Sequence, residues 1–175
     1  SKVLILPIFD NLNNNVSNDA LKIINKLNVK FLYVSSGEVY KNHINLIHAF
    51  IKFNKIYKNS SLTITVDKSY KSLIKILDSF KNSYNIINKG NIDRHDLISE
   101  YLKSDIFIFP STKESFGLGL IEAAQFHLPI IASNLPYVHS VVKPSSVFNP
   151  YDKNDIFDKL YNFDYDNYNS SKLIV

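Results

Sequence analysis

The sequence predicts an α/β fold, in which one parallel sheet is covered by helices in a doubly wound, Rossmann-like arrangement. Short apolar runs of strand type alternate with longer runs of helical periodicity along most of the 175-residue chain, which is typical of parallel sheets covered on both faces. Right-handed crossovers between consecutive strands then favour the doubly wound order. A hydrophobic content of 45% supplies a core for one domain.

The amino-terminal part begins with a strand-like run over residues 2–9, followed by a polar, Asn-rich stretch over residues 10–19. Residues 19–26 have helical spacing, and the apolar run over residues 30–36 is of strand type and ends at Ser-Ser-Gly. We therefore interpret residues 1–29 as a linker together with the first strand and helix of the domain.

The rest of the chain continues this alternation without an internal repeat. Asp93 is expected to cap a helix whose first turn also carries Asp96, and Gly90 ends the strand before it. In chain order we expect a helix over 42–59, a strand over 61–66, a helix over 69–83, a strand over 84–90, a helix over 93–104, a strand over 105–110, a helix over 115–126, a strand over 129–133, a short helix over 137–142, a strand over 146–150 and a helix over 153–163. Residues 164–175 are interpreted as a carboxyl-terminal tail.

The composition excludes several classes of function. Cysteine is absent, so disulfides, thiolate metal sites and cysteine nucleophiles cannot occur. The five histidines are widely spaced and form no metal-ligand pattern. The chain also lacks the glycine fingerprint of nicotinamide-binding proteins, a Walker motif and a nucleophile elbow. We therefore expect neither a metal ion nor a cofactor.

The formal charge of +4 is mild, the lysines are scattered, and Arg94 is the only arginine. Nucleic-acid binding prefers a clustered basic face, so we expect no nucleic-acid partner. An anionic small ligand and an anionic membrane surface agree with the excess charge about equally well, and both stay open. No run reaches the ~18 apolar residues of a membrane span, and no signal peptide opens the chain. The expected location is the cytoplasm or the inner face of the membrane.

Two carboxylates flank a glycine-bearing turn in the segment "PSTKESFGLGLIEAAQ", residues 110–125. Glu114 follows a strand, and ligands of doubly wound sheets bind beyond the carboxyl ends of the strands. The helix after the turn offers free amides and a partial positive charge, and Gly117 and Gly119 let a ligand approach the backbone. Glu122, further along this helix, can reach a more distant part of the same ligand.

On spacing alone, Glu114 and Glu122 are better explained as surface acids near a helix start, where negative charge is favoured. However, the segment over residues 104–142 resembles the donor-binding signature of GT-B glycosyltransferases of family 4, which are retaining enzymes. The E-x7-E motif of that family matches Glu114 to Glu122, and residues 33–50, "YVSSGEVYKNHINLIHAF", resemble its strand–loop–Lys-Asn–helix stretch. The resemblance covers residues 30–163 in the expected order, which favours the ligand site.

The resemblance implies a role for each matching residue. Glu114 would contact hydroxyls of the transferred sugar and Lys41 would pair with the diphosphate, so these two are the candidate catalytic residues. Taken alone, Lys41 is better explained as a solvated lysine ahead of a helix. The candidate donor-binding residues are Glu122 for the ribose hydroxyls, the backbone around Phe116, Gly117 and Leu118 for sugar or phosphate, Ser36 and Gly37 in the loop before Lys41, and Asn91 and Ile92 for the base.

The chain departs from the pattern of the family at several positions. The family usually has an arginine near the lysine, but Ser36 and Tyr40 occupy the corresponding positions, and Ser35 replaces the usual glycine. His127 stands where a glycine usually precedes Leu-Pro. Compensation of the phosphate charge would therefore depend on Lys41 and the helix dipole.

By resemblance, the chain is the carboxyl-terminal half of a GT-B fold, with an inter-domain linker in residues 1–29 and the donor-binding domain in residues 30–163. It would bind a nucleoside-diphosphate sugar weakly by itself. Together with a missing amino-terminal acceptor domain of the same protein, it would transfer a hexosyl-type sugar to a glycan, lipid or protein. Two alternatives stay open: a catalytically degenerate binding or assembly domain, and a sugar-nucleotide epimerase of related architecture.

Overall fold

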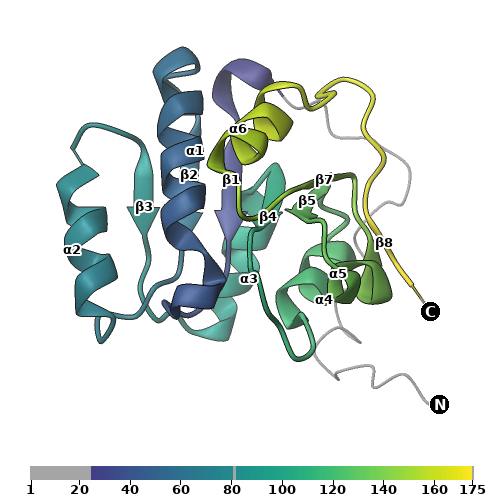
Figure 1. The fold of residues 1–175 in the computed structure, drawn as a ribbon, viewed down its shortest axis with the longest axis horizontal. Coiled ribbons are helices and arrows are strands. Elements are labelled where there is room, and N and C mark those ends of the chain that lie inside the picture. The colour runs from purple at the N-terminus through teal and green to yellow at the C-terminus, as the bar shows by residue number, and fades with distance from the viewer. Residues whose placement is uncertain (1–24, 81, 175) are drawn as a thin grey trace.

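Parallel strands form a six-stranded sheet at the centre of the computed structural model, which describes residues 25–80 and 82–174 (Figure 1). The strands are β1 (Lys30–Tyr33), β2 (Ser61–Ile64), β3 (Ile86–Asn88), β4 (Ile106–Phe109), β5 (Ile130–Ser133) and β7 (Ser146–Phe148). Their order is β3-β2-β1-β4-β5-β7, and all neighbouring pairs are parallel. The chain thus winds outward in both directions from β1 and β4, so the predicted doubly wound α/β fold is confirmed.

Helices cover both faces of this sheet. They are α1 (His43–Ile56), α2 (Lys71–Phe80), α3 (Arg94–Lys103), α4 (Leu118–Gln125), α5 (Pro136–Val141) and α6 (Lys153–Tyr161). The helices α1 and α2 lie on one face and α3, α4 and α5 on the other, as right-handed crossovers require (Figure 1). The helix α6 packs against α1 on the first face. In the described part of the chain, no helix is both long enough and apolar enough to cross a membrane.

The core consists of the strands and the inner sides of the helices. All residues of β4 and β5 are buried, as expected for parallel strands that are covered on both faces. The ring of Phe31 packs edge-on against Phe50 and Phe53 of α1, with centroids 6.1 and 5.3 Å apart. The apolar stripe that the sequence shows over residues 42–59 is therefore the side of α1 that faces the core.

Several element ends differ from the predicted ones. The helix expected from residue 115 begins at Leu118, because Gly117 before it has a left-handed backbone with φ +62°. The strands expected over 30–36 and 84–90 are shorter, since β1 ends at Tyr33 and β3 covers only Ile86–Asn88. The strand over residues 2–9, the linker over 10–19 and most of the helix over 19–26 lie outside the described residues.

Short elements complete the fold. Two 3-10 helices, η1 (Lys26–Asn28) and η2 (Val39–Lys41), flank β1. The strand β6 (Val142–Lys143) pairs antiparallel with β8 (Lys172–Leu173), which the sequence did not predict.

A buried hydroxyl anchors the carboxyl-terminal segment to the central sheet. The Oγ atom of Ser171 accepts a hydrogen bond from the Ile130 amide at 2.9 Å, and Ser171 is 3% exposed. Tyr165 and Tyr168 of the same segment are also buried. This segment therefore packs against the domain.

We expect Ser171→Ala to lower the free energy of unfolding by about 1 kcal/mol, because the Ile130 amide loses its shorter hydrogen bond and keeps only the longer one, to Oγ of Ser145 at 3.3 Å. Ser170→Ala, at the neighbouring and partly exposed position, is the control and should change that free energy by less than about 0.5 kcal/mol. Urea unfolding measures both values. Equal stabilities of the two variants would show that the Ser171 hydroxyl is not an anchor.

Candidate functional site

A hollow of about 400 Å³ lies at the carboxyl-terminal edge of the sheet, between the loops that follow β1 and β4. It is lined by Val34, Tyr40, Lys41, Phe109, Glu114, Ser115, Phe116, Gly117, Leu118, Gly119 and Glu122. We term it the Lys41 hollow. The predicted site residues Lys41, Glu114 and Glu122 and the turn over residues 116–118 therefore lie together.

Lys41 and Glu114 form an ion pair in this hollow. The Nζ atom of Lys41 lies 2.7 Å from Oε1 of Glu114, and the two side chains are only 14% and 11% exposed. Hydrogen bonds between charged groups are short and directional, so each side chain orients the other. The pair holds the two predicted catalytic groups at one point, although they are 73 residues apart in the chain.

Hydrogen bonds to main-chain carbonyls brace the two loops that carry this pair. The Thr112 amide donates to the Tyr40 carbonyl at 2.8 Å. The Nδ2 atom of Asn42 donates to the carbonyls of Pro110 and Pro150 at 3.0 and 2.7 Å. Asn42 itself has a left-handed backbone, φ +61°, which asparagine tolerates better than most residues. The position of Lys41 is thus fixed by its neighbours on both sides.

Two tyrosines, the buried Tyr33 and the partly buried Tyr137, fix the backbone next to this pair. The Tyr33 hydroxyl donates to the Lys41 carbonyl at 2.9 Å and lies 2.9 Å from Oγ of Ser111. The Tyr137 hydroxyl donates to the Ser111 carbonyl at 2.6 Å. None of these three residues could be predicted from the sequence, because a tyrosine or serine beside an apolar strand carries no motif.

A further buried tyrosine holds Glu122. The Tyr101 hydroxyl donates to Oε2 of Glu122 at 2.8 Å, and the Tyr101 ring stacks on Phe126 with centroids 4.9 Å apart. Burial raises the pKa of Glu122, while the hydrogen bond from Tyr101 and the charge of Arg94 oppose this rise. A carboxylate that is kept partly desolvated in a hollow is typical of a binding site.

The turn before α4 brings backbone amides to the hollow. Gly117 has φ +62°, and a Cβ atom there would lie 3.1 Å from Cδ1 of Leu120. Because α4 begins at Leu118, its first amides have no acceptor within the helix, and residues 117–119 line the hollow. The side chains of Phe116 and Leu118 are 76% and 51% exposed beside these amides. The turn therefore offers hydrogen-bond donors to an anion or a hydroxyl oxygen.

A second hollow, of about 480 Å³, adjoins the first. It is lined by Val34, Ser35, Ser36, Thr65, Asp67, Ser69, Tyr70, Gly90, Asn91, Ile92 and Leu97, and we term it the Asn91 hollow. Val34 lines both hollows. The predicted residues Ser36, Asn91 and Ile92 thus lie together, beside Lys41 and the two glutamates.

Gly37 is the one predicted site residue that lines neither hollow. It lines a groove between α1 and α2, where the ring of Tyr70 packs directly on it. Within residues 25–80 and 82–174, no group of three or more His, Asp and Glu side chains is arranged to hold a metal ion.

Residues 19–167 match the family described as "Glycosyl transferases group 1". The chain is 36% identical over 88 residues to alpha-monoglucosyldiacylglycerol synthase of Acholeplasma laidlawii. It is 28% identical over 129 residues to the O-antigen chain mannosyltransferase RfbU of Salmonella typhimurium. These alignments cover 50% and 70% of this chain but 22% and 35% of the relatives. The chain thus spans about a third or less of the length of these relatives.

Solved structures share the fold. The C-terminal domain of a glycosyl transferase group 1 family protein (LpcC) from Francisella tularensis has a TM-score of 0.65 at 22% identity, over 76% of this chain and 73% of that chain. The pneumococcal O-GlcNAc transferase GtfA, in complex with UDP and GlcNAc, has a TM-score of 0.62 at 21% identity, over 75% and 27%. Starch synthase IV of Arabidopsis thaliana, bound to ADP and acarbose, has 0.65 at 16% identity, over 83% and 32%. At these identities the likeness shows the fold alone, which is that of a GT-B domain.

We expect Gly117→Ala to destabilise the protein by more than the ~1–2 kcal/mol that a left-handed backbone costs an L-residue, because the new methyl group also presses on Leu120. Gly90→Ala is the matched control, since Gly90 has φ +68° but nothing within 4 Å of the added Cβ. Thermal unfolding of the two variants measures the difference. If both lose the same stability, the contact with Leu120 carries no cost.

The raised pKa of Glu122 predicts a pH-dependent stability. The folded state favours the protonated carboxyl, so the contribution of Glu122 is most favourable at low pH and is lost as the pH rises through its folded pKa. Glutamine keeps an acceptor for Tyr101 but does not ionise. We therefore expect Glu122→Gln to unfold at a higher temperature than the parent at pH 7, and the difference to vanish near pH 4, about the usual pKa of glutamate.

Glu38→Gln is the control for this experiment, because the expected change in its unfolding temperature at pH 7 is opposite to that of Glu122→Gln. Hydrogen bonds from Ser36 and Tyr70 lower the pKa of Glu38, so its contribution is present at neutral pH and is lost on acidification. This variant should unfold at a lower temperature than the parent at pH 7. A lower midpoint for Glu122→Gln at pH 7 would contradict the desolvation of Glu122.

Proposed function

The chain belongs to the glycosyl transferases group 1 family, and we propose that it is the donor-binding domain of a retaining glycosyltransferase. The donor would be a nucleoside-diphosphate sugar, and the acceptor a glycan, lipid or protein. The main support for this proposal is that one hollow is lined by Lys41, Glu114, Glu122 and the Gly117 turn. An ammonium group, free amides and carboxylate acceptors are the groups that a sugar diphosphate requires.

In this proposal the donor extends through both hollows, which meet at Val34. The diphosphate would lie between Lys41 and the first amides of α4, where the ammonium group and the helix dipole both favour negative charge. Glu114 would accept hydrogen bonds from the transferred sugar and Glu122 from the ribose, since a carboxylate can accept from both hydroxyls of a diol. The base would lie beside residues 90–92.

In this proposal these residues would act mainly by electrostatic stabilisation of negative charge. When the bond to the sugar breaks, negative charge grows on the departing diphosphate, and Lys41 with the α4 amides would stabilise it without a metal. The ammonium group of Lys41 has further hydrogens besides the one that Glu114 accepts. Glu114 likewise has a second oxygen for a sugar hydroxyl. The pair can therefore stay intact while both members bind the donor.

The partners and the location follow from the same proposal. The relatives extend well beyond the aligned part, so the acceptor would be bound by an amino-terminal domain of the same protein. The lipid glucosylation and O-antigen mannosylation named for these relatives support a role in glycolipid or polysaccharide synthesis. Bound UDP and ADP in the similar structures support a nucleotide donor. The protein would then act in the cytoplasm or on the inner face of the membrane.

A degenerate domain that binds without transfer is the second candidate function. Among the described residues that line the Lys41 hollow, Lys41 is the only basic one. Serine and tyrosine occupy the positions where the family usually has an arginine. Glu38, bonded to Ser36 and Tyr70, adds a negative charge in the same loop. One cation compensates a diphosphate less than two cations do, so weak donor binding is expected.

Calorimetric titration of the chain with UDP-, GDP- and ADP-sugars tests the donor site. We expect one nucleotide class to bind with a dissociation constant of about 0.1–1 mM. Lys41→Met should weaken this binding about tenfold or more, because a charge-assisted contact with phosphate is lost. Lys113→Met, at an exposed neighbouring position, should leave it unchanged. The absence of heat with every donor at millimolar concentration would contradict the site.

Transfer assays on the full-length protein separate the two candidate functions. In an active enzyme, Glu114→Gln should reduce kcat by about 10²–10³, a loss of the size seen when one polar contact to the reacting group is removed. Wild-type activity in this variant would refute the role of Glu114. A parent protein that binds the donor but transfers nothing would support the degenerate domain. Analysis of the products distinguishes transfer from epimerisation or hydrolysis.

A further inference from the structure

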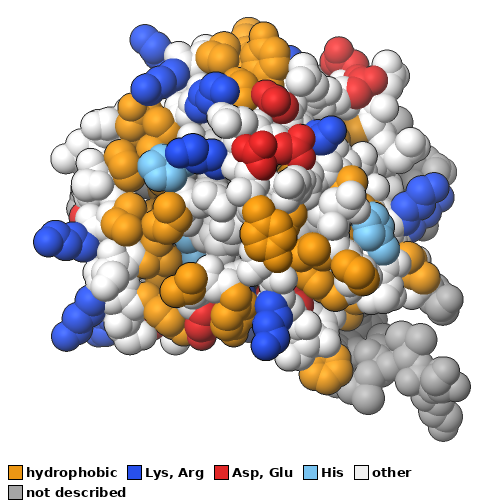
Figure 2. Space-filling model, in the orientation of Figure 1, with side chains coloured by type: hydrophobic (Ala, Val, Ile, Leu, Met, Phe, Trp, Pro, Cys, Tyr) orange, Lys and Arg blue, Asp and Glu red, His pale blue; other side chains and the backbone are white. Residues whose placement is uncertain are grey.

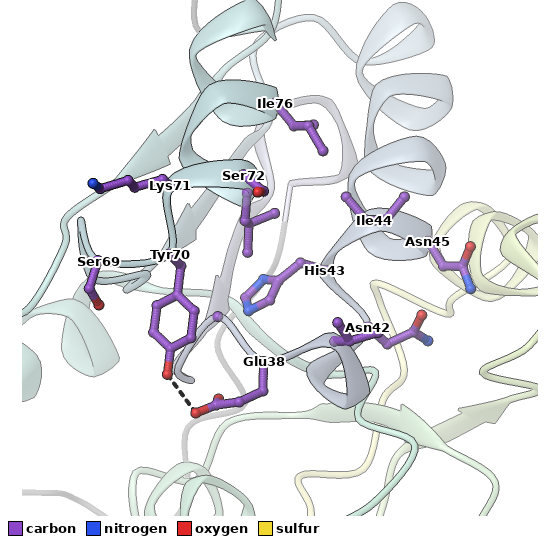
Figure 3. Close-up of a pocket in the computed structure, with 13 residues that line it drawn as sticks. Glu38, Asn42, His43, Ile44, Asn45, Ser69, Tyr70, Lys71, Ser72 and Ile76 are labelled. Atoms are coloured by element: carbon purple, nitrogen blue, oxygen red, sulfur yellow. Dashed lines mark hydrogen bonds between the residues drawn. The ribbon is translucent and has the colours of Figure 1, made fainter.

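A third depression, of about 580 Å³, lies between α1 and α2 (Figure 3). It is lined by Gly37, Glu38, Val39, Asn42, His43, Ile44, Asn45, Ser69, Tyr70, Lys71, Ser72, Leu73 and Ile76, and we term it the α1–α2 groove. The groove is larger than either hollow of the proposed donor site. It contains none of the residues Lys41, Glu114 and Glu122, so the donor does not account for it.

One end of the groove is apolar. Ile76 of α2 and Ile44 of α1 come from its two walls, and Ile76 lies at the end away from Glu38 (Figure 3). These side chains are 38% and 40% exposed, and Leu73 is buried between the helices. Figure 2 shows hydrophobic side chains gathered over this part of the surface, left of centre. Covering this apolar surface would be favourable for a ligand with an apolar part.

The other end is polar and contains a buried acceptor without a partner. His43 is 3% exposed, and its Nε2 atom lies 2.8 Å from the Ser36 carbonyl, so Nε2 is the protonated nitrogen of the neutral ring. Burial lowers the pKa of His43 to about 4, which keeps the ring neutral at pH 7. Its Nδ1 atom has no hydrogen-bond partner among the described residues. A buried unpaired acceptor costs free energy, and a ligand hydroxyl would satisfy it once the side chains that cover the atom move aside.

Glu38 provides a second acceptor at this end. Its carboxylate is held by the Tyr70 hydroxyl at 2.5 Å and by Oγ of Ser36, and Figure 3 shows the Glu38–Tyr70 bond at the end of the groove opposite Ile76. The ring of His43 points from α1 toward Tyr70 in the same view. The polar end therefore favours a neutral group that donates hydrogen bonds, and the charge of Glu38 disfavours an anionic one.

The polar end adjoins the Asn91 hollow of the proposed donor site. The turn η2 separates the two, since Val39 lines the groove and Lys41, two residues later, lines the Lys41 hollow. Tyr70 lines both the groove and the Asn91 hollow. A hydroxyl held at the polar end would therefore lie beside the part of the donor that would occupy the Asn91 hollow, with η2 between it and Lys41.

We propose that the α1–α2 groove binds an alcohol that carries an apolar tail. The tail lies between Ile44 and Ile76, and the hydroxyl-bearing head lies at Glu38 and His43. Binding of such an amphiphile stands on the groove alone. Its role as one part of a sugar acceptor, of which the amino-terminal domain would bind the rest, depends on the proposed function. A glycolipid and an acylglycerol share this chemistry, and the experiment separates the two.

The test is a ¹H–¹⁵N NMR titration of the 175-residue chain with n-octyl β-glucoside below its micelle concentration, with monooctanoyl glycerol, and with glucose as the control without a tail. We expect saturable shifts at the amides of Gly37, Ile44 and Leu73 with at least one amphiphile and none with glucose. Binding of one amphiphile alone identifies the source, and binding of both shows that the groove recognises the tail and a hydroxyl without selecting the rest of the head group. Equal shifts with glucose, or shifts that avoid the groove, would overturn the proposal.

A matched pair of variants locates the site. Ile76→Glu places a charge in the groove, whereas Ile87→Glu makes the same change on β3, outside the groove, at a position that is 44% exposed. We expect the first variant to weaken amphiphile binding by at least about tenfold, because a buried apolar contact is lost, and the second to leave it unchanged. Equal affinities would overturn the proposal.

Titrations with amphiphile and with donor test the groove and the donor site independently. Lys41→Met should leave amphiphile binding intact while it weakens donor binding. If the parent binds the amphiphile in the groove and no nucleotide sugar, the donor proposal fails and the groove stands. If the parent binds the donor and no amphiphile, the groove proposal fails and the donor site stands.

Discussion

The ion pair between Lys41 and Glu114 is the interaction around which the site is arranged. It joins the loops after β1 and β4, the neighbouring strands from which the chain winds in opposite directions. Because the helices that follow these strands lie on opposite faces of the sheet, a space opens between the two loops. The hydrogen bonds of Tyr33 and Asn42 fix the pair in that space. The glycine turn and Glu122 then line a space whose centre is already occupied by two fixed charges.

Much of the fold could be predicted from the sequence, because each strand of the large sheet is a short apolar run between polar turns. The ends of elements could not, because they depend on single backbone conformations such as the left-handed one at Gly117. His127 also has a positive φ, of +56°, which the sequence does not signal, because a residue other than glycine seldom adopts this backbone conformation. The pairing of β8 with β6 has no signal in the sequence, because a strand of two residues is too short to show a periodicity.

The candidate site, like the fold, could be predicted only in part from the sequence. A motif was enough to select Lys41, Glu114 and Glu122, and the structure brings them to one hollow. The residues that hold them could not be selected, because the contacts of Tyr33 with Ser111 and of Tyr101 with Glu122 join distant parts of the chain. The α1–α2 groove was not predicted either. Its exposed isoleucines look like ordinary surface residues until two helices place them on facing walls.

The mutual neutralisation of Lys41 and Glu114 bears on selectivity and turnover in the proposed function. A lysine at a helix start without a carboxylate partner would bind the inorganic phosphate that is abundant in cells. With a carboxylate already on the ammonium group, a bare anion is repelled as well as attracted, whereas a molecule that brings both phosphates and sugar hydroxyls satisfies both members. In the proposed function, a spent nucleotide would keep its contacts with Lys41 and the α4 amides but would offer no sugar hydroxyls to Glu114, so it would be released more readily than the intact donor.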